Sequence, residues 1–157
     1  MLILSLLLAS QVSSINLTAT PFPNDLTGPI GCTVFESGVL LEGDKDFGGI
    51  SALRLSGDES IFLSDDGLIY EASAVRNDAG FITGFIDIER SRIKDEKGRP
   101  LDKLRGDSES LATSGDEKFV GFERQHRISP LRKTAKGWQE LSSLIVDSRQ
   151  QLSGNSG

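Results

Sequence analysis

A tight turn that occurs twice constrains this chain more than any other feature of its sequence. Ser-Gly-Asp-Glu stands at 56–59 and again at 114–117, each time between two short apolar runs. Apolar runs bounded by turn residues are typical of β-hairpins. Aligned on the turn, the acidic end of the first copy, Asp65, falls on Glu123 of the second. The duplication predicts repeated small antiparallel sheets, as in the radial four-stranded sheets of a β-propeller. The alternative is two unrelated hairpins that share a common turn.

The rest of the chain also favours an all-β fold. Asn77-Asp78-Ala79-Gly80 and residues 95–100 have turn composition, and residues 33–41 are expected to form a hairpin around Glu36-Ser37-Gly38. Apolar residues at helical spacing occur only within residues 138–149. The predicted fold class is therefore all-β, built from antiparallel hairpins.

Composition excludes several classes of function. A chain of 157 residues predicts one domain, and its formal net charge of −6 argues against nucleic-acid binding, which needs a basic face. The one cysteine, Cys32, excludes an intramolecular disulfide, and its alternating surroundings predict a buried packing role. A single histidine removes the usual histidine-rich catalytic zinc sites.

The N-terminus has the pattern of a secretory signal. Residues 2–9 are continuously apolar but too short to span a membrane, and Val12-Ser13-Ser14 offers small residues before a cleavage point. We expect a signal peptide over 1–14, a mature start at Ile15, a periplasmic or secreted location and no remaining membrane span. No Lys or Arg precedes the apolar run, so a longer upstream start or a buried strand are the alternatives.

Charged residues gather at the ends of the expected hairpins, and oxygen-rich carboxylate clusters suit calcium. The expected metal ligands are Asp65, Asp66, Asp107 and Glu109, with calcium as the expected cation. The expected catalytic residues are Asp107, Glu109 and Glu123, and the residues expected to bind a substrate anion are Arg54, Arg124, His126 and Arg127. The alternative is that these carboxylates form surface ion pairs with the neighbouring arginines.

Residues 47–53 read Phe-Gly-Gly-Ile-Ser-Ala-Leu, residues 107–111 read Asp-Ser-Glu-Ser-Leu, and residues 121–128 read Gly-Phe-Glu-Arg-Gln-His-Arg-Ile. These runs resemble the phytase-like family, labelled "esterase-like activity of phytase". The first resembles the family's Phe-Gly-Gly-Leu-Ser-Gly-Leu, with Ala52 for a usual Gly. Residues 107–111 resemble Asp-x-Glu-Gly-Leu, with Ser110 for Gly, and 121–128 resemble Ser-Phe-Glu-Arg-x-His-Arg-Ile, with Gly for Ser. The resemblance implies a secreted or periplasmic β-propeller.

The strands are enough for two to three blades, whereas a propeller has typically four to eight. We therefore expect residues 15–157 to be an incomplete phytase-like β-propeller domain, truncated at the C-terminus and prone to self-association through an unpaired blade edge. The expected function is hydrolysis of a small-molecule ester or phosphoester. The alternative is a non-catalytic secreted propeller that binds a ligand or a protein partner.

Overall fold

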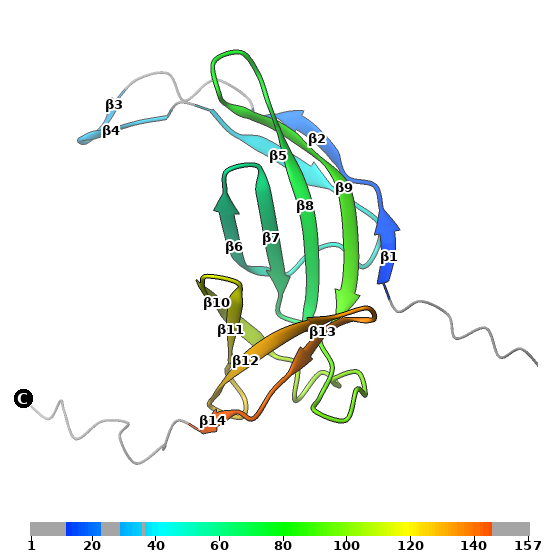
Figure 1. Cartoon of the computed structure of the whole chain (residues 1–157). Helices are drawn as coiled ribbons and strands as arrows, with labels where there is room; N and C mark the ends of the chain where they lie inside the picture. The colour runs from blue at the N-terminus through cyan, green and yellow to red at the C-terminus, as the bar shows by residue number, and fades with distance from the viewer. Residues whose placement is uncertain (1–11, 23–28, 36, 146–157) are drawn as a thin grey trace, which may run out of the picture.

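The computed structural model describes residues 12–22, 29–35 and 37–145. Every regular element in these ranges is a strand, and all strand pairs within the sheets are antiparallel (Figure 1). The all-β prediction is confirmed. None of the described residues forms a helix of the length and apolarity that a membrane span requires.

The first sheet is a meander of four consecutive strands with one added edge strand. β6 (Ile50–Ser56), β7 (Glu59–Ser64), β8 (Leu68–Arg76) and β9 (Ile82–Arg92) pair in chain order. β1 (Val12–Ile15) pairs with the far side of β9. The predicted cleavage point after Ser14 therefore falls inside β1, and residues 1–11 lie outside the described residues.

The second sheet repeats the meander. β10 (Ser108–Ser114), β11 (Glu117–Phe122), β12 (Arg127–Thr134) and β13 (Gly137–Glu140) pair in chain order, and β14 (Leu144–Ile145) pairs with β12. The helical spacing at 138–145 was a wrong indication, because Trp138 lies on β13 with its side chain buried between the sheets. Residues 146–149 of that pattern lie outside the described residues.

The repeated Ser-Gly-Asp-Glu turns are two-residue hairpins, as predicted. Ser56 pairs with Glu59 across the first turn, and the second turn has the same pairing. Gly57 and Gly115 have φ of 62° and 57°. A positive φ at the first central residue is the requirement that glycine meets in type II′ hairpin turns, whose twist matches that of the strands.

Two short ribbons complete the fold: β2 (Thr18–Pro21) with β5 (Val39–Glu42), and β3 (Pro29–Ile30) with β4 (Thr33–Val34). The hairpin expected over 33–41 is wrong, because β4 and β5 pair with earlier strands rather than with each other. Cys32 is exposed, not buried, because it lies in the turn between β3 and β4.

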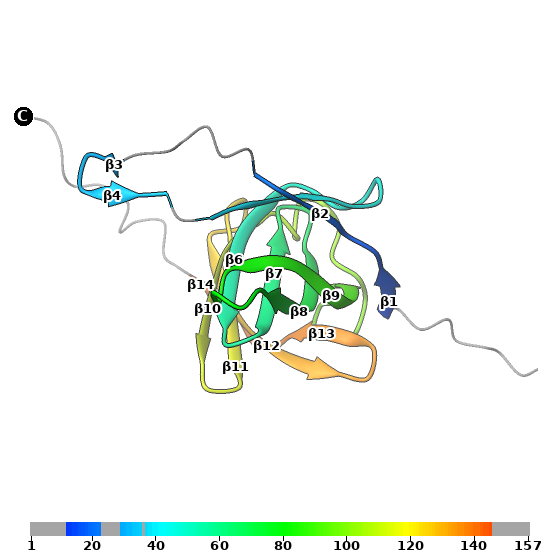
Figure 2. The ribbon, with the colours of Figure 1, turned by 90° about the horizontal axis from the view of Figure 1, so that it is seen from above.

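Successive side chains of a strand point to opposite faces of its sheet, so the first sheet has apolar side chains on both faces. Each face packs against another element of the fold. Figure 2 shows β2 and the second sheet on different sides of the first sheet. On β7, Ile61 and Leu63 pack in the cluster shared with the second sheet, whereas Phe62 packs in the cluster shared with the β2–β5 ribbon. Between the two sheets lies a cluster formed by Ile61, Leu63, Ile69, Ile93, Leu101, Val120, Phe122, Leu131 and Trp138. The opposite cluster contains Phe62, Tyr70, Ala72, Ala74, Phe85 and Ile88.

Candidate functional site

The end of β7, the start of β10 and the end of β11 lie close together where the two sheets meet (Figure 1). The Ser108 hydroxyl donates to the Ser64 carbonyl at 2.6 Å, and the Ser108 amide donates to the Asp65 carbonyl at 3.4 Å. The Glu123 amide donates to the Asp107 carbonyl at 2.9 Å. These contacts place the acidic turns after β7 and β11 beside the residue that precedes β10, so carboxylates from both copies of the repeat lie at one end of the fold.

Gly67 and Gly106 allow the β7–β8 turn to lie close to the loop before β10. Gly67 has a φ of +71°, and a Cβ added there would lie 3.0 Å from the Gly106 carbonyl oxygen. A larger residue at 67 would push the β7–β8 turn away from the loop that carries Asp107.

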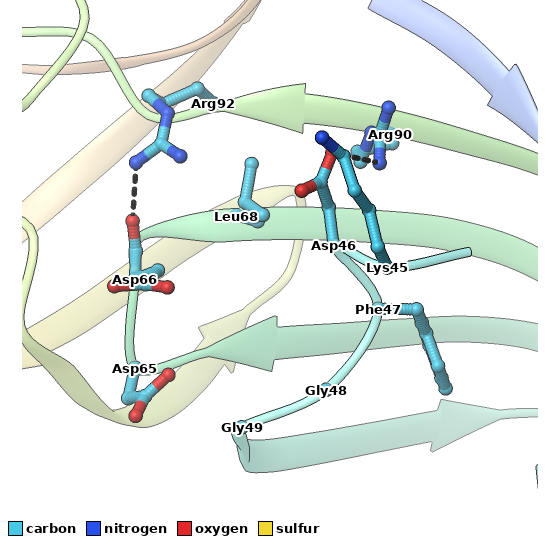
Figure 3. Close-up of a pocket in the computed structure, with 10 residues that line it drawn as sticks. All are labelled: Lys45, Asp46, Phe47, Gly48, Gly49, Asp65, Asp66, Leu68, Arg90 and Arg92. Carbon is cyan, nitrogen blue, oxygen red and sulfur yellow. Dashed lines mark hydrogen bonds and ion pairs between the residues drawn. The ribbon is translucent and has the colours of Figure 1, made fainter. Parts of the chain in front are cut away.

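A first pocket of about 580 Å³ opens at this end of the first sheet (Figure 3). We call it the arginine pocket. It is lined by Lys45, Asp46, Phe47, Gly48, Gly49, Asp65, Asp66, Leu68, Arg90 and Arg92. The run from Phe47 to Gly49 thus faces the acidic end of β7, because the Asp65 amide donates to the Gly49 carbonyl at 2.8 Å.

Ion pairs neutralise part of the arginine pocket. Arg90 pairs with Asp44 at 3.0 Å and with Asp46 at 3.4 Å, and Asp66 pairs with Lys103 at 3.3 Å. Arg92 instead donates to the main-chain carbonyl of Asp66 at 2.6 Å.

Tyr70 fixes the loop that forms one wall of the arginine pocket. Its hydroxyl donates to the Asp46 carbonyl at 2.6 Å. Burial raises the pKa of Tyr70 to about 12. The phenol therefore stays protonated at neutral pH and keeps this hydrogen bond.

A second pocket, of about 480 Å³, lies on the second sheet. We call it the histidine pocket. It is lined by Glu109, Ser110, Gly121, Phe122, Glu123, His126, Arg127 and Ile128. Four residues predicted for the site therefore share one pocket, although they come from different segments: Glu109 from the start of β10 and the others from the β11–β12 turn and its edges.

Arg127 of this pocket is held by the protein itself. Its buried guanidinium donates to Glu140 at 2.8 and 3.0 Å, to the Arg105 carbonyl at 2.6 Å and to Gln125 at 3.1 Å. It also lies 3.8 Å from the centroid of the Phe122 ring. A substrate-binding role for Arg127 stays a prediction; what the structure shows is an internal tie between the β11–β12 turn, β13 and the loop before β10.

Asp107 and Arg124 form the kind of ion pair that the alternative interpretation anticipated. The Arg124 Nε lies 2.5 Å from an Asp107 carboxylate oxygen. Asp107 is half-buried and Arg124 is exposed. The hydrogen bond to Asp107 raises the pKa of Arg124. The pair joins the start of β10 to the β11–β12 turn.

The remaining predicted residues are more scattered. Arg54 is exposed on β6, opposite Ile61, and lines neither pocket. Within residues 12–22, 29–35 and 37–145, no three His, Cys, Asp or Glu side chains gather into a group that could hold a metal ion. Asp65 and Asp66 line one pocket and Glu109 the other, so calcium binding by these residues stays a prediction.

Sequence reasoning missed Lys45, Arg90 and Arg92 in the arginine pocket. A signal for the two arginines was present, because Arg90 and Arg92 alternate around Ser91 at the end of a strand and so share a face. The buried partner of Arg127, Glu140, carried no such signal, because it lies 13 residues further along the chain, on the neighbouring strand β13.

Comparison with known proteins gives one match. A family model described as "Phytase-like: Esterase-like activity of phytase" matches residues 45–157. This range includes every residue that lines either pocket. No curated protein and no solved structure matches the chain.

Proposed function

Because this chain belongs to the phytase-like family, we propose that it is a hydrolase domain for ester or phosphoester bonds, with its acid–base groups in the histidine pocket. The observation that carries the proposal is that Glu109, Glu123 and His126 line one pocket, two carboxylates and an imidazole together. Side chains of these types transfer protons in hydrolysis when they are placed near the reacting bond.

The proposed chemistry needs a base and an acid. One glutamate takes a proton from water, whose oxygen forms the new bond to the carbonyl carbon or phosphorus. The ester bond breaks and the leaving oxygen receives a proton from His126 or from the other glutamate. Arg124, anchored by Asp107, is the group that would attract the charged part of the substrate.

We also propose that the two meanders are successive blades of a β-propeller. Each has four consecutive antiparallel strands, and their first strands, β6 and β10, lie next to each other. Side-by-side first strands of stacked four-stranded sheets are the arrangement around a propeller axis. Export to the periplasm or outside the cell is part of this proposal, and N-terminal sequencing of the mature protein from the expressing cell would test it.

The test is turnover of 4-nitrophenyl acetate and 4-nitrophenyl phosphate by the full chain. Glu109→Gln, Glu123→Gln and His126→Asn should each lower kcat/KM by roughly 10²–10⁴-fold. Glu117→Gln is the matched control, because Glu117 is exposed at the hairpin turn of the same sheet and lines neither pocket. If a metal chelator abolishes turnover, the predicted calcium ion takes part in the reaction.

Absence of turnover by the wild-type chain on both esters, with saturable binding of either, would favour the non-catalytic binding function instead. Equal activity of the three histidine-pocket variants and the control would place catalysis elsewhere.

A further inference from the structure

We propose that the arginine pocket binds a small oxyanion, the phosphate or carboxylate group of a small molecule, through the side chains of Arg92 and Lys45. This site is separate from the histidine pocket and does not depend on the proposed hydrolase function.

The charges of the pocket leave two cations without a carboxylate partner. Arg90 is neutralised by Asp44 and Asp46. Across the described part of the chain, no carboxylate lies within ion-pairing distance of Arg92 or Lys45. Arg92 is half-buried, and among the described residues its guanidinium donates to the Asp66 carbonyl alone, so it has other N–H donors to spare. A half-buried cation without a counter-ion attracts an anion.

Two apolar residues form part of the pocket wall. Phe47 and Leu68 line it, and the Phe47 ring packs edge-on against Tyr70 with centroids 5.2 Å apart. Charge–charge attraction is stronger beside apolar side chains than in open water. Because Tyr70 also donates to the Asp46 carbonyl, the loop that carries Lys45 is fixed before a ligand arrives.

The Asp65 carboxylate lowers the positive charge of the arginine pocket. Asp65 makes no ion pair with any described residue. Figure 3 shows it on the opposite side of the pocket from Arg92, next to Gly49, with its carboxylate directed away from the guanidinium. Asp65 therefore weakens the attraction for anions without occupying Arg92. The pocket volume of about 580 Å³ and the net charge of −6 favour a small oxyanion over a polyanion.

The test is isothermal titration of the full chain at low ionic strength with inorganic phosphate and, separately, with acetate. Saturable binding of phosphate alone identifies a phosphate site, and binding of acetate identifies a carboxylate site. Arg92→Gln should weaken binding at least about tenfold, since a hydrogen bond to a charged group is lost. Lys45→Gln should weaken it less, and Asp65→Asn should tighten it. Arg132→Gln, an exposed arginine of β12 outside the pocket, is the matched control.

Thermal denaturation of each variant checks folding. Lys45→Gln keeps the test decisive if Arg92→Gln does not fold, because Lys45 is exposed and its side chain forms no ion pair with a described residue. No saturable binding of either anion, or binding that Lys45→Gln, Arg92→Gln and Asp65→Asn all leave unaltered, would overturn the proposal.

Discussion

The Ser108 hydroxyl, at the first residue of β10, donates a 2.6 Å hydrogen bond to the main-chain carbonyl of Ser64, the last residue of β7. Both residues are almost fully buried. This bond crosses from one sheet to the other, because β7 and β10 are not paired with each other. It fixes where the acidic turn after β7 lies relative to the start of β10.

Ser108→Ala should destabilise the protein by about 0.5–1.5 kcal/mol, because it removes this hydrogen bond while the Ser64 carbonyl still accepts one from the Gly67 amide at 3.0 Å. Urea denaturation measures the change. Ser110→Ala is the control, since Ser110 lies two residues along the same strand and is exposed. Equal losses in both variants would mean that the bond across the sheets contributes no specific stability.

Glu140→Ala should be more damaging, by roughly 3–5 kcal/mol, because it leaves the Arg127 guanidinium buried without its counter-ion. The Arg127 and Glu140 side chains are 7% and 2% exposed. Glu117→Ala, at an exposed position of the same sheet, should change the free energy of unfolding by less than about 0.5 kcal/mol. A loss below 1 kcal/mol in Glu140→Ala would show that Arg127 finds another partner or reaches water.

Asp95 should make stability depend on pH in the acid range. Hydrogen bonds from the backbone and side chain of Arg99 lower the pKa of Asp95 to about 2. Since this is below the value of the unfolded chain, the contribution is complete above about pH 4 and is lost as the pH falls toward 2. The difference in unfolding free energy between wild type and Asp95→Asn should therefore shrink between about pH 4 and pH 2.

Denaturant titrations at several pH values measure this difference. Asp116→Asn, in the exposed turn of the second hairpin, controls for the general loss of negative charge. A wild-type advantage that stays constant down to about pH 2 would contradict the assignment.

Gly49→Ala and Gly48→Ala form a matched pair in the wall of the arginine pocket. An alanine at 49 would have a φ of +56° and a Cβ 2.2 Å from an Asp65 carboxylate oxygen. The backbone conformation alone costs about 1–2 kcal/mol. At Gly48 the space is open and φ is not in the left-handed region, so alanine should change stability by less than about 1 kcal/mol. Equal thermal shifts for the two variants would mean that the loop adapts.

The elements that sequence reasoning predicted well are those set by neighbouring residues. Gly57-Asp58 and Gly115-Asp116 specify their hairpins locally, because a two-residue turn needs a particular backbone conformation. The same local signal led to the carboxylates at the strand ends. Glu109 lies near Glu123 and His126 because the hairpin pairs the start of β10 with the end of β11.

Features that depend on distant partners were not predictable in this way. Arg127 has the sequence context of an exposed substrate ligand, yet Glu140 buries it. The strand pattern of residues 33–41 does not show which strands pair, and the partner of β5 is β2, an earlier strand. Strand alternation places Arg90 and Arg92 on one face, but it does not show that the Phe47–Gly49 loop folds back to form a pocket with them.

The pairing of β1 with β9 has a consequence for the order in which this protein folds. Strands β6 to β9 join neighbours in sequence, whereas Val12 must find Ser91 across most of the described chain. Closing so long a loop costs entropy that only a preformed partner edge repays. We therefore expect β1 to dock last and detach first, and its amides to exchange with solvent well before those of β8, which stays enclosed by strands on both sides.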